Sequence, residues 1–147
     1  MSQTNPADQT AGEICAAIAA GELSSRDALE AHLERVEARN GPINAVVALD
    51  AEGARARADE ADAAHARGEQ WGVLHGLPMT IKDSYEVPGM PTTSGAPEFA
   101  NHMAASNAVA VQRLVDAGAI VFGKTNLPLY AGDVQSYNAV YGTTGNP

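Results

Sequence analysis

The sequence has few cysteines, aromatic residues and positive charges, and it has no long apolar run. Its single cysteine, Cys15, excludes an internal disulfide and a site built from several thiolates. With 9 lysines and arginines against 18 aspartates and glutamates, the net charge of −9 disfavours binding to the phosphates of nucleic acid. No apolar run reaches the roughly 20 residues that cross a bilayer, and the start MSQTNPADQT is unlike a secretion signal. We therefore expect a cytoplasmic protein that binds neither nucleic acid nor membranes.

Hydrophobic periodicity and breaker residues predict an α/β protein in which helices precede the start of a mixed sheet. Thr10 and Glu13 have the spacing of a capping box, so a helix should begin at Thr10. Residues 1–9 are polar and are expected to be disordered. The later elements are expected to be a helix from Ser24 or Ser25 to 40–42, a strand at 45–49, a solvated outer helix at 51–67, a strand at 78–82, a helix from Ser106 or Asn107 to Gly118, and a strand at 119–122.

One segment matches a phosphate-binding pattern by its letters alone. Gly118, the four residues AIVF, and then Gly123-Lys124-Thr125 fit G-x-x-x-x-G-K-[ST]. The pattern binds phosphate when a loop leads into a helix, whereas here the middle residues favour a strand and Pro128 interrupts any helix that follows. We therefore predict no nucleotide site and interpret Lys124 as a structural residue that leaves a strand.

The histidines and the cysteine give no pattern for a metal site or a nucleophile. The four histidines lack both the H-x-H and the H-E-x-x-H spacing. Cys15 lies on a helix of small residues without a cationic neighbour, which is typical of a small buried hydrophobe. We therefore predict that these residues form no metal site.

The candidate catalytic residue is Lys82, in the segment GLPMTIKDS at 76–84. An apolar strand that carries an ammonium into the core removes its water, which favours the neutral amine and allows it to accept a proton. The alternative is a strand-end lysine that only reaches solvent. Because successive side chains of a strand point to opposite faces, Asp83 is expected to hold the loop that follows.

Three blocks in a fixed order resemble the amidase signature family: GLPMTIKDSYEVPGMPTTSGAP, AVQRLVDAGAIVFGKTNLP and QSYNAVYGTTGNP. The resemblance implies a mixed sheet surrounded by helices and the hydrolysis of carboxylic amides by a Ser-cisSer-Lys triad, with Lys82 as its lysine. In the family, both serines follow the asparagine-proline that matches Asn146-Pro147. The resemblance therefore implies that residues 1–147 are the N-terminal part of one amidase domain, with the catalytic serines beyond residue 147.

The resemblance also implies the roles of other parts of the protein. Neutral Lys82 would take the proton of the nucleophilic serine through the cis-serine and later pass it to the leaving amine. Residues 90–95 and 130–141 resemble loops that border the active site. The resemblance implies that no metal or organic cofactor is required. The implied partners are a small-molecule amide substrate and the remainder of the chain, and a homodimer is compatible with the resemblance.

Two alternatives remain open at the level of sequence. The first is the family's glutamyl-tRNA amidotransferase subunit, although the segment GDVQSYNAVYGTT looks more like free-standing bacterial amidases. The second is a non-catalytic fragment of the same fold. In each case residues 1–147 alone should be inactive, and an incomplete sheet should make them aggregate.

Overall fold

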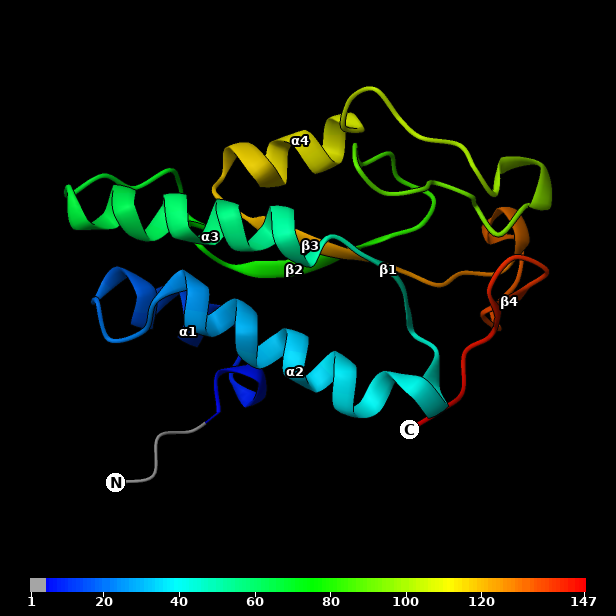
Figure 1. Ribbon diagram of the computed structural model, residues 1–147, viewed down its shortest axis with the longest axis horizontal. Coiled ribbons are helices and arrows are strands. Elements are labelled where there is room, and N and C mark those ends of the chain that lie inside the picture. The colour runs from blue at the N-terminus through cyan, green and yellow to red at the C-terminus, as the bar shows by residue number, and fades with distance from the viewer. Residues whose placement is uncertain (1–4) are drawn as a thin grey trace. The chain divides into compact units, whose positions relative to one another are not determined.

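The computed structural model describes residues 5–147 (Figure 1). These residues fall into two units. Unit 1 contains residues 5–37, 51–79 and 113–122, and unit 2 contains residues 38–50, 80–112 and 123–147. Helices and a small mixed sheet make up the chain, so the predicted α/β class is confirmed. No helix among the described residues is both long enough and apolar enough to cross a bilayer.

The elements follow the predicted order with shifted ends. The α-helices are α1 (Ala11–Ala19), α2 (Ser25–Ile43), α3 (Ala51–Ala66) and α4 (Val109–Asp116), and the 3-10 turns are η1 (Pro6–Asp8), η2 (Pro97–Phe99) and η3 (Leu129–Ala131). The strands are β1 (Val46–Leu49), β2 (Pro78–Lys82), β3 (Ile120–Thr125), β4 (Tyr137–Asn138) and β5 (Gly142–Thr143).

The start of α1 confirms the predicted capping box. The Thr10 hydroxyl accepts a hydrogen bond from the Glu13 N–H (3.3 Å), and the Glu13 carboxylate accepts one from the Thr10 N–H (2.7 Å). Of the nine residues expected to be disordered, 1–4 lie outside the described part of the chain. The turn η1 differs from that expectation, because Arg35 donates to the Ala7 carbonyl (2.7 Å) and holds the turn.

The second helix ends later than predicted. Pro42 lies inside α2, which continues to Ile43, although the Asn-Gly-Pro sequence was expected to end it. Asn44 has a φ of 56°, a left-handed conformation that stops the helix. The side chain of Asn40 accepts hydrogen bonds from the N–H groups of Ala45 and Val46, so it satisfies the backbone where the chain turns into β1.

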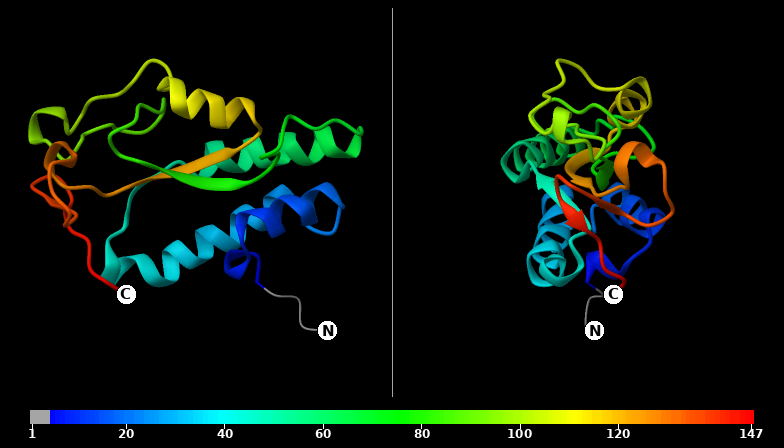
Figure 2. Two further views of the ribbon diagram at one scale, coloured as in Figure 1. Left: turned by 180° about the vertical axis from the view of Figure 1, so that it is seen from behind. Right: turned by 90° about the vertical axis from the view of Figure 1, so that its right-hand side faces the viewer.

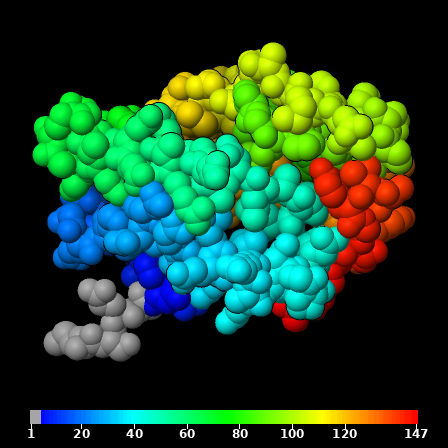
Figure 3. All heavy atoms as spheres, in the orientation of Figure 1, coloured from blue at the N-terminus to red at the C-terminus, as the bar shows by residue number. Residues whose placement is uncertain are grey.

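Unit 1 has an apolar core. Helix α3 presents one alanine face to this core and leaves its other face exposed, as expected for an outer helix (Figure 3). One cluster joins this alanine face to Leu29 and Leu33 of α2 and to the start of β3. A second cluster packs Ile14 and Ile18 of α1 with buried and half-buried neighbours. Burial of apolar area is therefore the main source of stability in unit 1.

The sheet has the strand order β1-β3-β2. Strand β1 is antiparallel to β3, with Ala48 opposite Lys124 and a shift in register between Val46 and Ala48. The Leu77 carbonyl accepts from Ile120 N–H (2.8 Å) and Asp83 N–H donates to the Thr125 carbonyl (3.0 Å), so β2 and β3 run parallel. The strand predicted at 119–122 extends to Thr125, which places Lys124 inside β3 rather than beyond it.

In unit 2, the segment after residue 136 lies beside the end of α2 (Figures 1 and 2). The Asn44 side chain donates to the Tyr141 carbonyl (2.7 Å), and the Thr144 hydroxyl donates to the Asn44 carbonyl (2.8 Å). Strands β4 and β5 form a short antiparallel pair here, in a stretch where no periodic element was predicted. The pair is too short to produce a hydrophobic period in the sequence.

Candidate active site

Lys82 is the last residue of β2, and its side chain is exposed among the described residues. The expected burial of Lys82 is therefore wrong for residues 5–147. Ile81 and Asp83 on either side are buried, so the alternation of the strand turns Lys82 to the other face. The Lys82 amine is accessible to a group that approaches from outside these residues.

The buried lysine is Lys124, the only other lysine of the chain. Its side chain is 0% exposed, and its ammonium has three oxygen partners. These are the Thr92 hydroxyl at 2.9 Å, the Pro91 carbonyl at 3.1 Å and the Asp83 carboxylate at 3.3 Å. The first two contacts are hydrogen bonds and the third is an ion pair, so three oxygens surround the Lys124 ammonium.

The burial that was predicted for Lys82 is found at Lys124, and the accessible amine is that of Lys82. Burial lowers the pKa of Lys124, and the Asp83 carboxylate partly opposes that effect. A general base must still reach the proton that it removes. Lys124 is fully enclosed and committed to three acceptors, whereas Lys82 is accessible. The geometry therefore favours Lys82 as the lysine that can meet a reacting group.

Asp83 holds the loop that follows β2, as the sequence predicted. Its Oδ2 atom accepts hydrogen bonds from the Thr93 N–H (3.1 Å) and the Thr93 hydroxyl (2.5 Å). The Asp83 carbonyl accepts from the Ser94 N–H (3.1 Å). The side chains of Asp83 and Lys124 are each 0% exposed. Each charge is compensated by the other, and the loop adds hydrogen bonds to both side chains.

The two segments that resemble active-site loops come together in unit 2. The Tyr130 N–H donates to the Ser94 carbonyl (2.8 Å), and the Tyr141 side chain lies near Thr93 and Asp83. Burial and the nearby Asp83 carboxylate raise the pKa of Tyr141. Gly95 has a φ of 69°, and a Cβ there would lie 2.9 Å from the side chain of Asn138. The segments 90–95 and 130–141 therefore border the residue next to Lys82.

Two asparagines fix the second of these segments. Asn138 donates to the Asn126 side-chain oxygen (2.7 Å) and to the Leu127 carbonyl (2.8 Å), and its own oxygen accepts from two backbone N–H groups. Asn126 donates to the Gly142 carbonyl (3.2 Å) and to the Thr144 hydroxyl (3.0 Å). These contacts replace the ladder of a regular sheet and give the loop a defined conformation.

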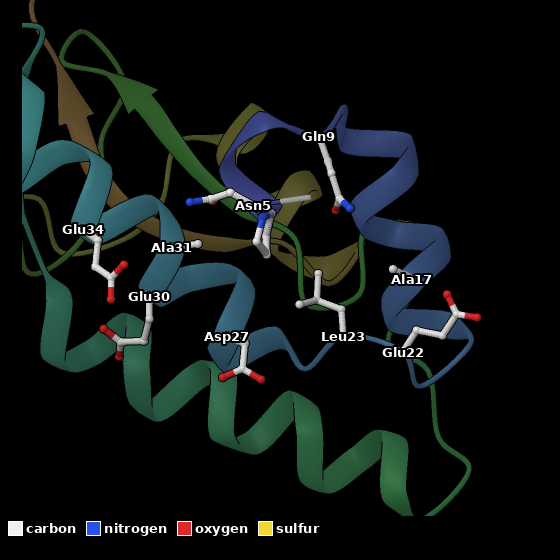
Figure 4. A pocket seen from close by; sticks show the side chains of 10 residues that line it. Asn5, Gln9, Ala17, Glu22, Leu23, Asp27, Glu30, Ala31 and Glu34 are labelled. Atoms are coloured by element: carbon white, nitrogen blue, oxygen red, sulfur yellow. The ribbon is translucent and has the colours of Figure 1, made fainter. Parts of the chain in front are cut away.

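A pocket of about 650 Å³ in unit 1 is lined by none of the predicted site residues (Figure 4). Its rim carries the carboxylates of Glu22, Asp27, Glu30 and Glu34, and Glu30 is bound by Arg26 and Arg55. Among residues 5–147, no group of three or more His, Cys, Asp and Glu side chains is placed to hold a metal ion. Burial raises the pKa of the half-buried Cys15 thiol, so this thiol is poorly suited to attack.

Sequence reasoning missed the buried ion pair of Lys124 and Asp83. The available signal was the position of Lys124 in an apolar run that continues as a strand, because a charged residue there needs a buried partner. That partner is Asp83, which lies 41 positions earlier in the sequence. Its neighbour Lys82 was predicted to be the buried lysine instead.

Comparison with known proteins gives consistent matches. A family model described as Amidase matches residues 27–147. The chain is 40% identical over 138 residues to a subunit of the glutamyl-tRNA(Gln) amidotransferase of Streptomyces coelicolor, covering 94% of the chain and 28% of that relative. It is 41% identical over 150 residues to an acylamidase of Rhodococcus erythropolis, covering 100% of the chain and 31% of that relative.

A solved structure agrees with these matches. The native peptide amidase from Stenotrophomonas maltophilia superposes with a TM-score of 0.87 at 34% identity, over 96% of this chain and 30% of that one. The chain thus spans about 28 to 31% of the length of the curated relatives described above.

Proposed function

The chain belongs to the amidase family, and from this premise we propose that the complete protein hydrolyses carboxylic amides with Lys82 as its general base. The observation that carries the proposal is the accessible amine at the end of β2, next to a residue that is buried and tightly held. The chain has only two lysines, and the other one is enclosed by three acceptors. Lys82 is therefore the lysine of this chain that can serve as a base.

The proposed reaction needs two serines that we place beyond residue 147. The neutral Lys82 amine takes a proton from the nucleophilic serine through the cis-serine, and the serine oxygen attacks the amide carbonyl. The proton then passes to the leaving nitrogen as the C–N bond breaks. Water hydrolyses the resulting acyl-enzyme, which releases the carboxylate. Backbone N–H groups near the serines hold the oxyanion, and no metal or organic cofactor takes part.

The proposed partners and compartment follow from the same premise. The substrate is a small-molecule amide, since the acylamidase and the peptide amidase are each named for amide substrates. The remainder of the protein covers Lys82, which is exposed among the described residues. We place the protein in the cytoplasm, in agreement with its single cysteine and its net charge of −9.

A second candidate function is that of the glutamyl-tRNA amidotransferase subunit. The similarity to that relative, at 40% identity, is nearly the same as the similarity to the acylamidase, at 41%. The two functions differ in whether partner proteins are needed. A subunit works together with other subunits, whereas the name of the acylamidase mentions no subunit. Release of ammonia from simple amides by the purified protein would favour the stand-alone amidase.

The test is a comparison of Lys82→Ala and Lys82→Arg in the complete protein, with ammonia release from simple amides as the readout. We expect both variants to lose hydrolysis by at least about 100-fold, because arginine keeps the positive charge but cannot act as a neutral base. Arg113→Ala removes an exposed cation elsewhere and serves as the control. Activity in Lys82→Arg would show that charge, and not proton transfer, is the role of Lys82. Activity in Lys82→Ala would refute the proposal.

A further inference from the structure

Asp83, the residue after Lys82, is held through both its backbone and its carboxylate. The residue is 0% exposed, although it follows directly on the exposed Lys82. Its backbone fixes it to β3 and to the following loop, and its carboxylate fixes it to the same loop and to a cation. The partners are the Thr125 carbonyl (3.0 Å), the Ser94 N–H (3.1 Å), the Thr93 N–H and hydroxyl (3.1 and 2.5 Å) and the Lys124 ammonium (3.3 Å).

The partners of Asp83 are tied to one another. Lys124 binds Asp83 and also the Pro91 carbonyl and the Thr92 hydroxyl, so one ammonium joins β3 to the loop. The Thr93 hydroxyl donates to Asp83 and accepts from the Gly95 N–H (3.0 Å). The peptide that follows Lys82 is therefore clamped between a strand and a loop that are themselves cross-linked.

We propose that Asp83, held by Lys124 and Thr93, is the positioning residue for Lys82. The proposal rests on the proposed function, because it assigns Asp83 the task of placing the base of that reaction. A lysine side chain has four rotatable bonds, and a base must lie within hydrogen-bond distance of its proton. Fixing the backbone directly after Lys82 removes one source of misplacement. An error of about 1 Å in such a group lowers a rate by roughly 100-fold.

A purely structural role is the competing explanation. A buried ion pair is often no more stabilising than apolar residues of similar volume, so stability alone is a weak reason for this pair. The position of the pair favours the other explanation, because Asp83 follows the only accessible lysine of the chain among its described residues. The two explanations differ in one respect. A structural role affects melting, whereas a positioning role affects kcat at unchanged substrate binding.

The experiment compares Thr93→Val with Thr93→Ser in the complete protein. Asp83→Asn would leave Lys124 buried without its counter-charge, so the milder change at Thr93 is used. Valine keeps the methyl group and removes the hydroxyl that binds Asp83, and serine does the reverse. We expect Thr93→Val to lower kcat by about 10- to 100-fold at nearly constant KM. We expect Thr93→Ser to keep kcat within about threefold while it melts at a lower temperature, because it lacks a buried methyl group.

Thr143→Val makes the same chemical change at an exposed position of unit 2 and should leave kcat unchanged. Equal kcat in Thr93→Val and the unsubstituted protein would overturn the positioning role. Equal losses of kcat in Thr93→Val and Thr93→Ser would also overturn it, because the hydroxyl would then not be the cause. Lys82→Arg in the same assay separates the two proposals: if it stays active, the proposed base is wrong, whatever Thr93 does.

Discussion

The two units are stabilised by different interactions. Both hydrophobic clusters of the described residues lie in unit 1, where leucine, isoleucine and alanine side chains fill the interior. The interior of unit 2 mixes six buried apolar residues with five buried polar ones, which are the Lys124–Asp83 pair, two threonines and Asn126. Unit 2 also carries most of the exposed large hydrophobic side chains, among them Tyr85, Phe99, Tyr130 and Val134.

This difference bears on the proposed function, because the proposed base lies in unit 2. An apolar core tolerates exchange among residues of similar volume, whereas a buried polar network depends on the geometry of each hydrogen bond. Unit 2 holds Lys82 and both segments that border Asp83. Side chains there are fixed by direction as well as by volume, which is what the proposed proton transfer at Lys82 would require.

The largest effect is expected when the buried charge of unit 2 loses its partner. Lys124→Met in the complete protein leaves the Asp83 carboxylate buried and unpaired, and should lower the free energy of unfolding by about 3–5 kcal/mol. Arg113→Met, which removes an exposed cation from unit 1, should change it by about 0.5 kcal/mol or less. Urea denaturation measures both. Similar values for the two variants would remove the distinction between the units.

A second test asks how tightly unit 1 is packed. Gly76 and Gly68 both have a φ of 77°, but a Cβ at Gly76 would lie 2.1 Å from the Ser25 hydroxyl, and one at Gly68 meets nothing within 4 Å. Gly68→Ala should cost about 1 kcal/mol from backbone strain alone. Gly76→Ala should cost about 2–4 kcal/mol, because it adds a collision with a fully buried residue.

Ser25→Ala supplies the control for this test. The Ser25 hydroxyl is buried and has no hydrogen-bond partner among the described residues, so its removal should be nearly neutral for stability. In the Gly76→Ala background, Ser25→Ala should recover part of the loss, which a double-mutant cycle in urea would measure. Strict additivity of the two changes would show that the collision is not the cause.

The smallest effect is expected from the charges on the surface of unit 1. Hydrogen bonds from Arg55 and Arg26 lower the pKa of Glu30 from 4.5 to about 2. A lowered carboxyl pKa stabilises the fold at pH values above about 4.5, and this contribution is lost as the pH falls from about 4.5 to about 2. Because Glu30 is 31% exposed, its network contributes only about 1 kcal/mol.

Glu30→Gln should therefore lower the free energy of unfolding by about 1 kcal/mol at pH 7 and by progressively less below pH 4.5. Glu34→Gln removes a charge one turn further along α2, which no arginine binds among residues 5–147, and serves as the control. Thermal melts between pH 7 and about pH 2 test whether the stability lost in Glu30→Gln becomes smaller as the pH falls. A loss that persists unchanged at about pH 2 would show that charge pairing at Glu30 is not its source.

Features set by neighbouring residues were predictable from the sequence. The capping box at Thr10 and Glu13 and the strand at 78–82 each depend on residues within one turn or one strand, and both are confirmed. The amidase family, inferred from three sequence blocks, is also confirmed. The catalytic role of Lys82 stays a prediction.

Features set by distant contacts were not predictable in the same way. The burial of Lys124 depends on Thr92 and Pro91, which are 32 and 33 positions away, and no local pattern encodes these contacts. The exposure of Lys82 depends on which segments cover β2, and strand periodicity does not determine that. The end of α2 past Pro42 is a local feature instead, because the contacts of Asn40 there are with Ala45 and Val46, 5 and 6 positions away.

The contacts of Asn44 with Tyr141 and Thr144 have a consequence for the order of events during translation. These partners are about 100 positions apart in sequence, so the Asn44 side-chain amide and the Asn44 carbonyl lack them until residues 141 and 144 have left the ribosome. Unit 1 needs the chain only as far as Phe122. Nascent chains arrested after that residue should therefore protect the apolar core from protease before the loops around Asp83 become resistant.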